Sequence, residues 1–204
     1  MLCRQAIDDE TLGLLKQLQA MPEFMDLRLV GGTALALQRG HRKSIDLDLF
    51  GRLSADSIAV SNCLAKLGRI IELGGSENIH VYSVNDVKVD IVNYPYPWLD
   101  EPIIADGIIL AAIPDIAAMK LAAVTNRGGK KDFVDIYWLL KEFTLDEMLE
   151  FYCRKFEQGS ALLVLKSLAY FDDAETDEMP MMFDPCTWAE IKTNIQAAVK
   201  ECAL

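Results

Sequence analysis

The chain has 204 residues, 51% of them hydrophobic and 25% charged, with a formal net charge of −11 at pH 7. This length suffices for one large domain or two small ones with a buried core, and the negative charge argues against broad, nonspecific nucleic-acid binding. No apolar run is long enough to predict a membrane span, and Asp8, Asp9 and Glu10 stand where a secretion signal needs apolar residues, so we expect a cytoplasmic protein. Five scattered cysteines without a CxxC pair predict reduced, mostly buried thiols rather than disulfides or a zinc site.

The first part of the chain mixes helical and strand patterns. Leucines at helical spacing predict an opening helix over residues 10–20, and a short apolar run predicts a strand over residues 27–30. This strand leads into Gly31 and Gly32, which are followed by a short run of helix-forming residues that stops at Gly40.

The next stretch alternates with period two, with Ile45, Leu47 and Leu49 on one side and Asp46 and Asp48 on the other. Strand interiors are depleted in aspartate, so two on one face are unusual for a purely structural strand. Their Cβ atoms would be roughly 7 Å apart, which allows both carboxylates to converge on one divalent cation.

Further strand and helix patterns follow this acidic strand. A helix is predicted over residues 54–67, then a strand over residues 69–73 and a glycine turn at residues 74–76. The strongest hairpin pattern joins residues 79–84 to residues 87–92 through two residues that tolerate positive φ.

The second strand of this hairpin carries Lys88 and Asp90 on one face. A third inward-facing acid on a strand next to Asp46 and Asp48 is what a two-metal carboxylate site requires. The alternative is an edge strand with ordinary exposed polar residues.

The rest of the chain is predominantly helical. We therefore predict an α+β chain, in which residues 1–113 form a mixed-sheet α/β domain and residues 114–204 form a helical domain packed against it. The elements expected after the hairpin are a last strand over residues 107–113, a helix capped by Asp115 and ending near Asn126, a helix over residues 131–143, a helix with a Thr144–Glu147 capping box, an apolar helix over residues 160–171, an acidic arm over residues 172–184, and a C-terminal helix that starts with Thr187 and Glu190.

The glycine turn offers a chemistry that complements the aspartates. Gly31, Gly32 and Thr33 would place backbone N–H groups and a hydroxyl at a helix N-terminus, which suits a phosphate. A double glycine alone is a weak signal, but one closely followed by Asp46 and Asp48 is more specific. One element could hold a triphosphate while the other holds the Mg²⁺ that bridges it.

Two basic groups lie near acids in the sequence, and each either contacts phosphate or forms ordinary solvated surface. In the second group, Lys120 with Lys130 or Lys131 would contact phosphates or substrate, while Asp132 or Asp135, which share a helix face, would orient a basic residue or act on the nucleophile. Alternatively, Asp132 simply complements the positive end of the helix dipole. The first group is Arg39, His41, Arg42 and Lys43, and the second is Lys120, Arg127, Lys130 and Lys131.

Three motifs resemble the nucleotidyltransferase toxin family of AbiEii/AbiGii type, a branch of the DNA polymerase beta-like nucleotidyltransferases. They are GGTAL at residues 31–35, SIDLDLF at residues 44–50 and MKLAAVTNRGGKKDFVDIYWLL at residues 119–140. The resemblance covers residues 25–160 or so and leaves the acidic arm and the last helix unmatched. Thr33 stands where much of the wider superfamily has serine, which preserves the hydroxyl.

The resemblance implies a nucleotidyltransferase-like fold and transfer of NMP from an NTP to an acceptor hydroxyl, dependent on Mg²⁺ or Mn²⁺. It also implies an RNA or tRNA acceptor, a toxin role in a toxin–antitoxin or phage-defence system, and a cognate antitoxin. Two alternatives stay open: a catalytically inactive nucleotide-binding protein on this fold, and a transferase acting on a small molecule such as an antibiotic. Carried over by position, the metal ligands are Asp46, Asp48 and Asp90, with Asp90 as the candidate general base. The catalytic residues are these three acids together with Lys120, Asp132 and Asp135. The nucleotide contacts are Gly31, Gly32, Thr33, Arg42, Lys43, Lys120 and Lys131.

Overall fold

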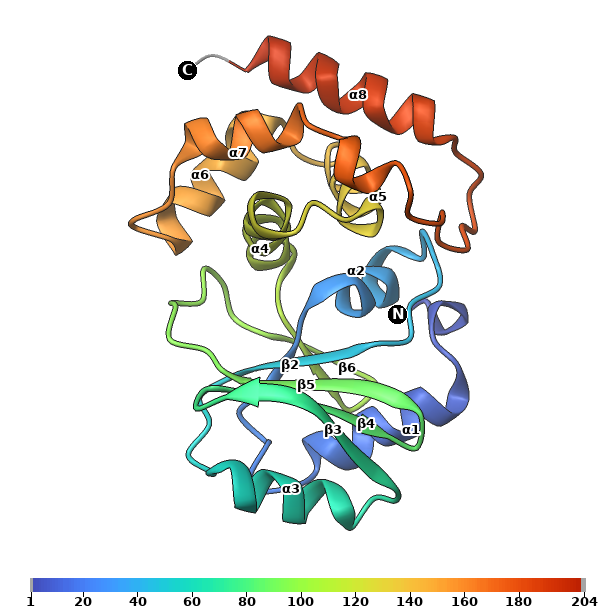
Figure 1. Ribbon diagram of the computed structural model, residues 1–204, viewed down its shortest axis with the longest axis vertical. Coiled ribbons are helices and arrows are strands. Elements are labelled where there is room, and N and C mark those ends of the chain that lie inside the picture. Colours follow the sequence, from blue (N-terminus) through green and yellow to red (C-terminus); the bar gives the residue numbers. More distant parts are fainter. Residues whose placement is uncertain (1, 203–204) are drawn as a thin grey trace. The chain divides into compact units, whose positions relative to one another are not determined.

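The computed structural model describes residues 2–202 and contains a mixed seven-stranded sheet together with eight α-helices within that range (Figure 1). The chain divides into two compact units. Unit 1 runs up to Pro95 and includes Pro102–Ala111, while unit 2 comprises Tyr96–Glu101 and the residues from Ala112 onward. All strands belong to unit 1 and the helices of unit 2 follow them in the chain, which confirms the predicted α+β class.

The sheet of unit 1 has the strand order β3-β4-β5-β2-β1-β7-β6. Strand β2 lies parallel to β5, and β1 lies parallel to β7, whereas the other neighbours are antiparallel. The strands are β1 (Arg28–Leu29), β2 (Leu47–Gly51), β3 (Ile70–Ser76), β4 (Ile79–Val84), β5 (Val87–Asn93), β6 (Ile103–Ala105) and β7 (Ile108–Leu110).

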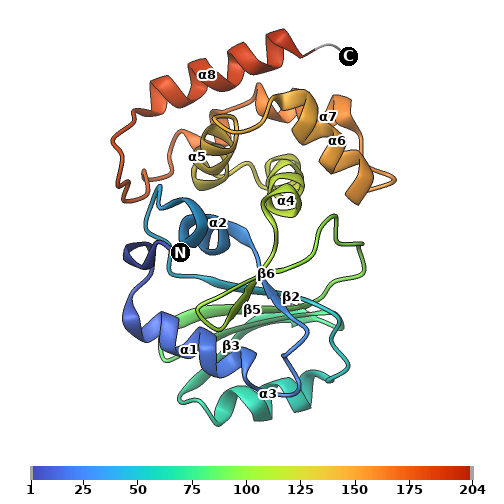
Figure 2. The same ribbon diagram turned by 180° about the vertical axis from the view of Figure 1, so that it is seen from behind.

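Three helices cover the sheet of unit 1. Helices α1 (Asp9–Gln19) and α3 (Ser57–Ala65) lie on one face and α2 (Gly31–Arg39) lies on the other, as the two opposite views show (Figures 1 and 2). Strand β2 follows period-two alternation, because Leu47 and Leu49 are fully buried while Asp48 between them is only partly buried. A short 3₁₀ turn, Arg4–Ala6, precedes α1.

Two local predictions in unit 1 were wrong. Ile45 is 53% exposed, because the regular strand begins only at Leu47. The expected turn at residues 74–76 is instead the end of β3, where the register with β4 shifts between Glu72 and Gly74. The glycines therefore mark a β-bulge rather than a chain reversal.

The predicted hairpin is confirmed as β4 and β5. Asn85 and Asp86, which connect the two strands, have φ values of 49° and 68°. Both residues tolerate the left-handed region, as the tight turn requires.

In unit 2, α4 packs against α5, α6 and α7, while α8 contacts α5 and α7 (Figures 1 and 2). Both predicted capping boxes are present, Thr144 with Glu147 and Thr187 with Glu190. The helices are α4 (Ile113–Asn126), α5 (Lys130–Leu139), α6 (Leu145–Lys155), α7 (Ala161–Leu168) and α8 (Trp188–Glu201), and a 3₁₀ turn, η2 (Asp172–Ala174), lies in the acidic arm.

Asp115 does not cap α4 as predicted, because the helix already begins at Ile113. Its carboxylate is fully buried, lies 2.7 Å from Lys155 Nζ and accepts a hydrogen bond from the Leu99 amide at 2.9 Å. Lys155 Nζ also donates to the Pro97 carbonyl. This ion pair attaches the loop at residues 96–101 to the helices of unit 2.

The cysteines are all free, as expected, but only Cys63 is buried, so the prediction of mostly buried thiols was wrong. Within residues 2–202, none of the helices has the length and apolar character needed to cross a membrane.

Candidate active site

The glycine turn forms the N-terminus of α2. Gly31, Gly32 and Thr33 are the first residues of this helix, so their N–H groups have no acceptor within it. Gly31 has a φ of +68°, and a Cβ atom at this position would lie 2.2 Å from Asp48 Oδ2. Glycine is therefore required here both for its backbone conformation and for the close approach of the Asp48 carboxylate.

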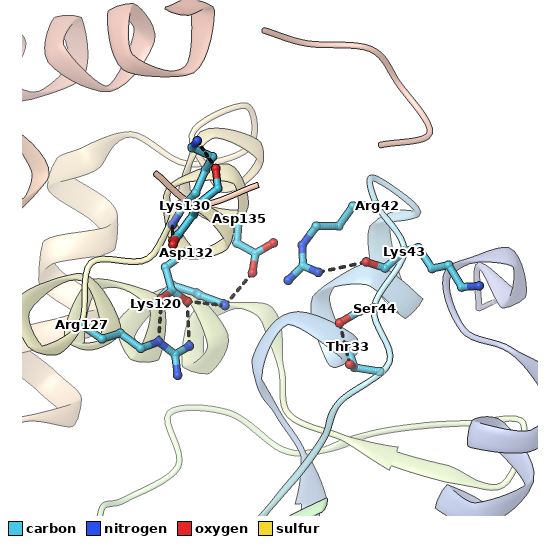
Figure 3. Close-up of polar contacts among 10 residues, drawn as sticks. Thr33, Arg42, Lys43, Ser44, Lys120, Arg127, Lys130, Asp132 and Asp135 are labelled. Atoms are coloured by element: carbon cyan, nitrogen blue, oxygen red, sulfur yellow. Dashed lines mark hydrogen bonds and ion pairs between the residues drawn. The ribbon is translucent and has the colours of Figure 1, made fainter. Parts of the chain in front are cut away.

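Thr33 faces the protein interior. It is 1% exposed, and its hydroxyl donates to the Asp46 carbonyl at 2.5 Å with Ser44 Oγ 2.8 Å away (Figure 3). The hydroxyl thus fixes the segment that carries Asp46 to the start of α2. This is a positioning role, and the predicted contact of Thr33 with a nucleotide stays a prediction.

The three predicted metal ligands lie on one face of the sheet, which we call the carboxylate face. Asp48 and Asp90 are direct register partners on the parallel strands β2 and β5. Asp46 directly precedes β2, and its charge acts on Lys88, which projects from the same face as Asp90. The structure therefore pairs Asp48 with Asp90, which lie 42 positions apart in the sequence, and leaves Asp46 at the start of the same strand.

The chemistry of the carboxylate face fits a divalent cation, because carboxylate oxygens are the ligands that Mg²⁺ and Mn²⁺ prefer. Asp90 Oδ1 is buried without a hydrogen-bond partner, which is unusual for a buried acceptor. Its other oxygen, Oδ2, is 2.9 Å from Lys88 Nζ. In the part of the chain that is described, no three acid, histidine or cysteine side chains are gathered closely enough to hold a metal ion.

Arg42 and Lys43 precede the carboxylate face in the chain. Arg42 is only 3% exposed, and its Nη1 donates to the Lys43 carbonyl at 3.1 Å (Figure 3). Lys43 is an exposed residue. Their predicted nucleotide contacts stay predictions.

Unit 2 contains a second group of charges, formed by Lys120, Arg127, Asp132 and Asp135, which we call the ion cluster. Lys120 Nζ on α4 lies 2.9 Å from Asp132 Oδ1 and 2.6 Å from Asp135 Oδ2, both on α5 (Figure 3). Arg127 binds Asp132 through two nitrogens, at 2.7 and 2.9 Å. The spacing of three residues on α5 thus directs both carboxylates to the same lysine.

Burial and charge act in opposite directions on Asp132. Burial alone raises the pKa of this carboxyl, but the charges of Lys120 and Arg127 and their hydrogen bonds outweigh burial and hold the pKa below its usual value. Asp132 also lies in the first turn of α5, as the helix-dipole alternative requires. That alternative is incomplete, because the side chain accepts hydrogen bonds from two cations.

Lys130 and Lys131 have different environments. Lys130 is buried; its amide donates to Asp177 Oδ2 at 2.9 Å, and its ammonium group binds the carbonyls of Glu175 and Asp177. The acidic arm therefore caps α5, whose N-cap residue Gly129 has no side chain to do so. Lys131 is exposed, so it is the lysine of this pair that remains available to a ligand.

The overall fold is similar to solved structures that include a nucleotidyltransferase toxin. JHP933 from Helicobacter pylori matches 95% of this chain and 92% of its own at 18% identity, with a TM-score of 0.57. MenT4, a nucleotidyltransferase toxin from Mycobacterium tuberculosis H37Rv, matches 95% of this chain and 84% of its own at 14% identity, with a TM-score of 0.59. The fold is that of a nucleotidyltransferase.

Sequence comparison gives the family. Residues 13–201 match the family described as "Nucleotidyl transferase AbiEii toxin, Type IV TA system". The uncharacterized protein aq_aa25 of Aquifex aeolicus (strain VF5) is 34% identical over 182 residues, which cover 86% of this chain and 87% of that protein. The chain belongs to the AbiEii nucleotidyltransferase toxin family, as its three motifs indicated.

Proposed function

We propose that this nucleotidyltransferase transfers NMP from an NTP to a hydroxyl of an RNA acceptor. The observation that carries the proposal is the direct pairing of Asp48 with Asp90 on β2 and β5, beside the N–H groups of the first turn of α2. The contact between Gly31 and the Asp48 carboxylate places these two elements side by side. A phosphate-binding helix end next to a set of carboxylates matches the needs of a phosphoryl substrate and its metal.

Each group on this face has a defined task in the proposed reaction. The N–H groups of α2 bind triphosphate oxygens. Asp46, Asp48 and Asp90 would hold a divalent cation, which would supply neutralisation of phosphate charge and polarisation of the hydroxyl. The acceptor oxygen forms a bond to the α-phosphorus, the α–β phosphoanhydride bond breaks, and pyrophosphate leaves. Asp90 accepts the proton of the hydroxyl, as its position on the sheet suggests.

A depression in unit 2 supports RNA as the acceptor. It has a volume of about 240 Å³, lies at the C-terminal end of α4, and is lined by two cations, Arg127 and Lys166, by Tyr170 and by one acid, Asp173. Tyr170 is 52% exposed. Cationic side chains beside an accessible aromatic ring are the combination that binds single-stranded nucleic acid, by phosphate attraction and base stacking.

The test is incorporation of label from each of the four α-³²P-labelled NTPs, with Mg²⁺ or Mn²⁺ and total RNA, by the wild type and by Asp46→Ala. We expect label to enter RNA from one preferred nucleotide, and the variant to lose this activity. Transfer that survives the substitution would contradict the metal assignment. Label found in a small molecule, or nucleotide binding without any transfer, would favour one of the two alternative functions.

The acceptor is tested separately with Lys166→Ala and Tyr170→Ala. If the depression binds RNA, Tyr170→Ala raises the KM for RNA by about tenfold, since loss of one stacked base costs about 1–3 kcal/mol. Lys166→Ala also raises the KM for RNA, because it removes a phosphate contact, and the KM for NTP stays unchanged in both variants. The toxin role predicts that expression slows growth of the host, that Asp46→Ala does not, and that a cognate antitoxin restores growth. Protection of the host from phage would extend the role to defence.

A further inference from the structure

Lys88 is a cation on the carboxylate face. Lys88 and Asp90 are two positions apart on β5, so both side chains project from the same face of the sheet. Lys88 Nζ lies 2.9 Å from Asp90 Oδ2. Because Asp90 is the register partner of Asp48, this ammonium group is located at the carboxylate that would complete the metal site.

The influence of Lys88 extends beyond its direct partner. Burial lowers the pKa of Lys88, but the hydrogen bond and charge of Asp90, followed by the charges of Asp48 and Asp46, raise it above the usual value. The ammonium group therefore lies in the field of all three acids. It partly offsets the repulsion among carboxylates that share one face.

The ion pair is suited to being opened. The Lys88 side chain is 45% exposed, compared with 5% for Lys120 in the ion cluster. Ion pairs near the surface contribute little net stability, and lysine carries its charge on a flexible four-carbon stem. Separating Lys88 from Asp90 therefore costs little free energy. Separating Lys120 from its partners costs much more, because it would leave buried carboxylates without the ammonium group that neutralises them.

The Asp90 carboxylate is also incompletely satisfied. While Oδ2 binds Lys88, Oδ1 is buried without a partner. A buried acceptor of this kind points to a missing ligand. A divalent cation at Asp90 would satisfy the carboxylate more fully, but it could not share the position with the ammonium group 2.9 Å away, because the two positive charges repel.

We propose that Lys88 is a built-in counter-ion that occupies Asp90 in the metal-free protein and is displaced when a divalent cation binds the carboxylate face. The proposal rests on the proposed metal-dependent function. It accounts for the arrangement of the side chains, in which the three acids share a face without being gathered into a metal site. Lys88 thus sets the metal affinity, and Asp90 becomes available to metal and acceptor only after Lys88 has left.

Metal affinity provides the first test, with Mn²⁺ as the probe. Isothermal titration is performed on the wild type, Lys88→Met, Lys66→Met and Asp46→Asn. Lys66 is exposed at the end of α3, so Lys66→Met makes the same change in net charge without touching the carboxylate face. We expect Lys88→Met to bind Mn²⁺ about tenfold more tightly than the wild type, a difference of about 1.4 kcal/mol, and Lys66→Met to differ by less than about twofold.

The outcomes separate this proposal from the one on which it rests. If Lys88→Met binds Mn²⁺ with unchanged or weaker affinity while Asp46→Asn loses binding, the metal site stands and the displacement by metal is refuted. If neither the wild type nor any variant binds Mn²⁺, the metal-dependent function and the displacement both fall.

A second test uses the wild-type protein and does not depend on the folding of a variant. Reductive methylation followed by peptide mass spectrometry measures how accessible the Lys88 amine is, with and without Mn²⁺. We expect methylation of Lys88 to rise severalfold when Mn²⁺ is bound, while methylation of Lys66 stays constant. An unchanged or reduced rate at Lys88 under saturating Mn²⁺ would show that the ion pair with Asp90 persists in the metal-bound protein.

Discussion

The carboxylate face of unit 1 and the ion cluster of unit 2 use the same residue types in opposite ways. In the ion cluster, two buried carboxylates are matched by two cations, Lys120 and Arg127. On the carboxylate face, Asp90 pairs with the half-exposed Lys88 beside its register partner Asp48. Balanced and buried charges hold a structure together, whereas an excess of one sign on an accessible face leaves room for a ligand. The burial of the ion cluster predicts that it contributes more to stability than the carboxylate face does, while the catalytic role predicted for Lys120, Asp132 and Asp135 stays a prediction.

The largest effect on stability is expected for Lys120→Met. Removing this ammonium group leaves Asp135 and part of Asp132 as buried carboxylates without their main partner, which costs about 3–5 kcal/mol. Urea unfolding gives the free energy directly. Arg127→Met is the matched control, since it removes the same charge from Asp132 but its side chain is 70% exposed, and we expect about 1 kcal/mol or less. Equal losses in the two variants would contradict the distinction between buried and accessible charge.

Asp48→Asn should show the converse behaviour. This substitution keeps the shape of the side chain against Gly31 but removes one charge from the carboxylate face. We expect NMP transfer to fall by at least about 100-fold, equivalent to about 2.7 kcal/mol, while the free energy of unfolding falls by less than it does in Lys120→Met. Asp86→Asn, at an exposed hairpin position, should leave both quantities unchanged. A variant that unfolds more readily yet retains transfer would reverse the roles assigned to the two regions.

Thr33→Val tests how the segment before β2 is held. The substitution preserves shape but deprives the Asp46 carbonyl and Ser44 of their buried hydroxyl partner, which costs about 1–2 kcal/mol. Transfer should fall as well, because Asp46 is no longer fixed. Thr33→Ser should behave nearly as the wild type, and Thr193→Val, which loses a hydroxyl contact on the exposed face of α8, should have little effect. Normal stability of Thr33→Val would mean that its hydroxyl is not a structural contact.

The smallest effect is expected from mild acid. The pKa of Asp132 is lowered in the folded protein, so its contribution to stability is complete above the ordinary carboxyl range and is lost as the pH falls through the folded-state value. Urea unfolding from pH 7 to pH 3 should therefore show stability declining below about pH 4. Asp132→Asn should be less stable at pH 7 and lose less on acidification. A parallel decline in both proteins would assign acid sensitivity to other groups.

Local patterns were sufficient to predict much of the fold. The hairpin of β4 and β5, both capping boxes and the succession of helices after the sheet follow from residues within a few positions of each other. Element ends were less predictable. Ile45 and Gly74 fitted local rules for a strand and a turn, but pairing with neighbouring strands determined where β2 begins and where β3 continues.

The sequence by itself determined the family, the glycine turn and the acids at positions 46, 48 and 90, because these depend on residue type and spacing. Only the tertiary structure decided which partner each charged or polar group has. Thr33 turns toward Ser44, Lys88 binds Asp90, and the buried Asp115 pairs with Lys155, 40 residues away. Such choices depend on which elements pack together and on the cost of burying an unpaired charge, and neither can be read from neighbours in the chain.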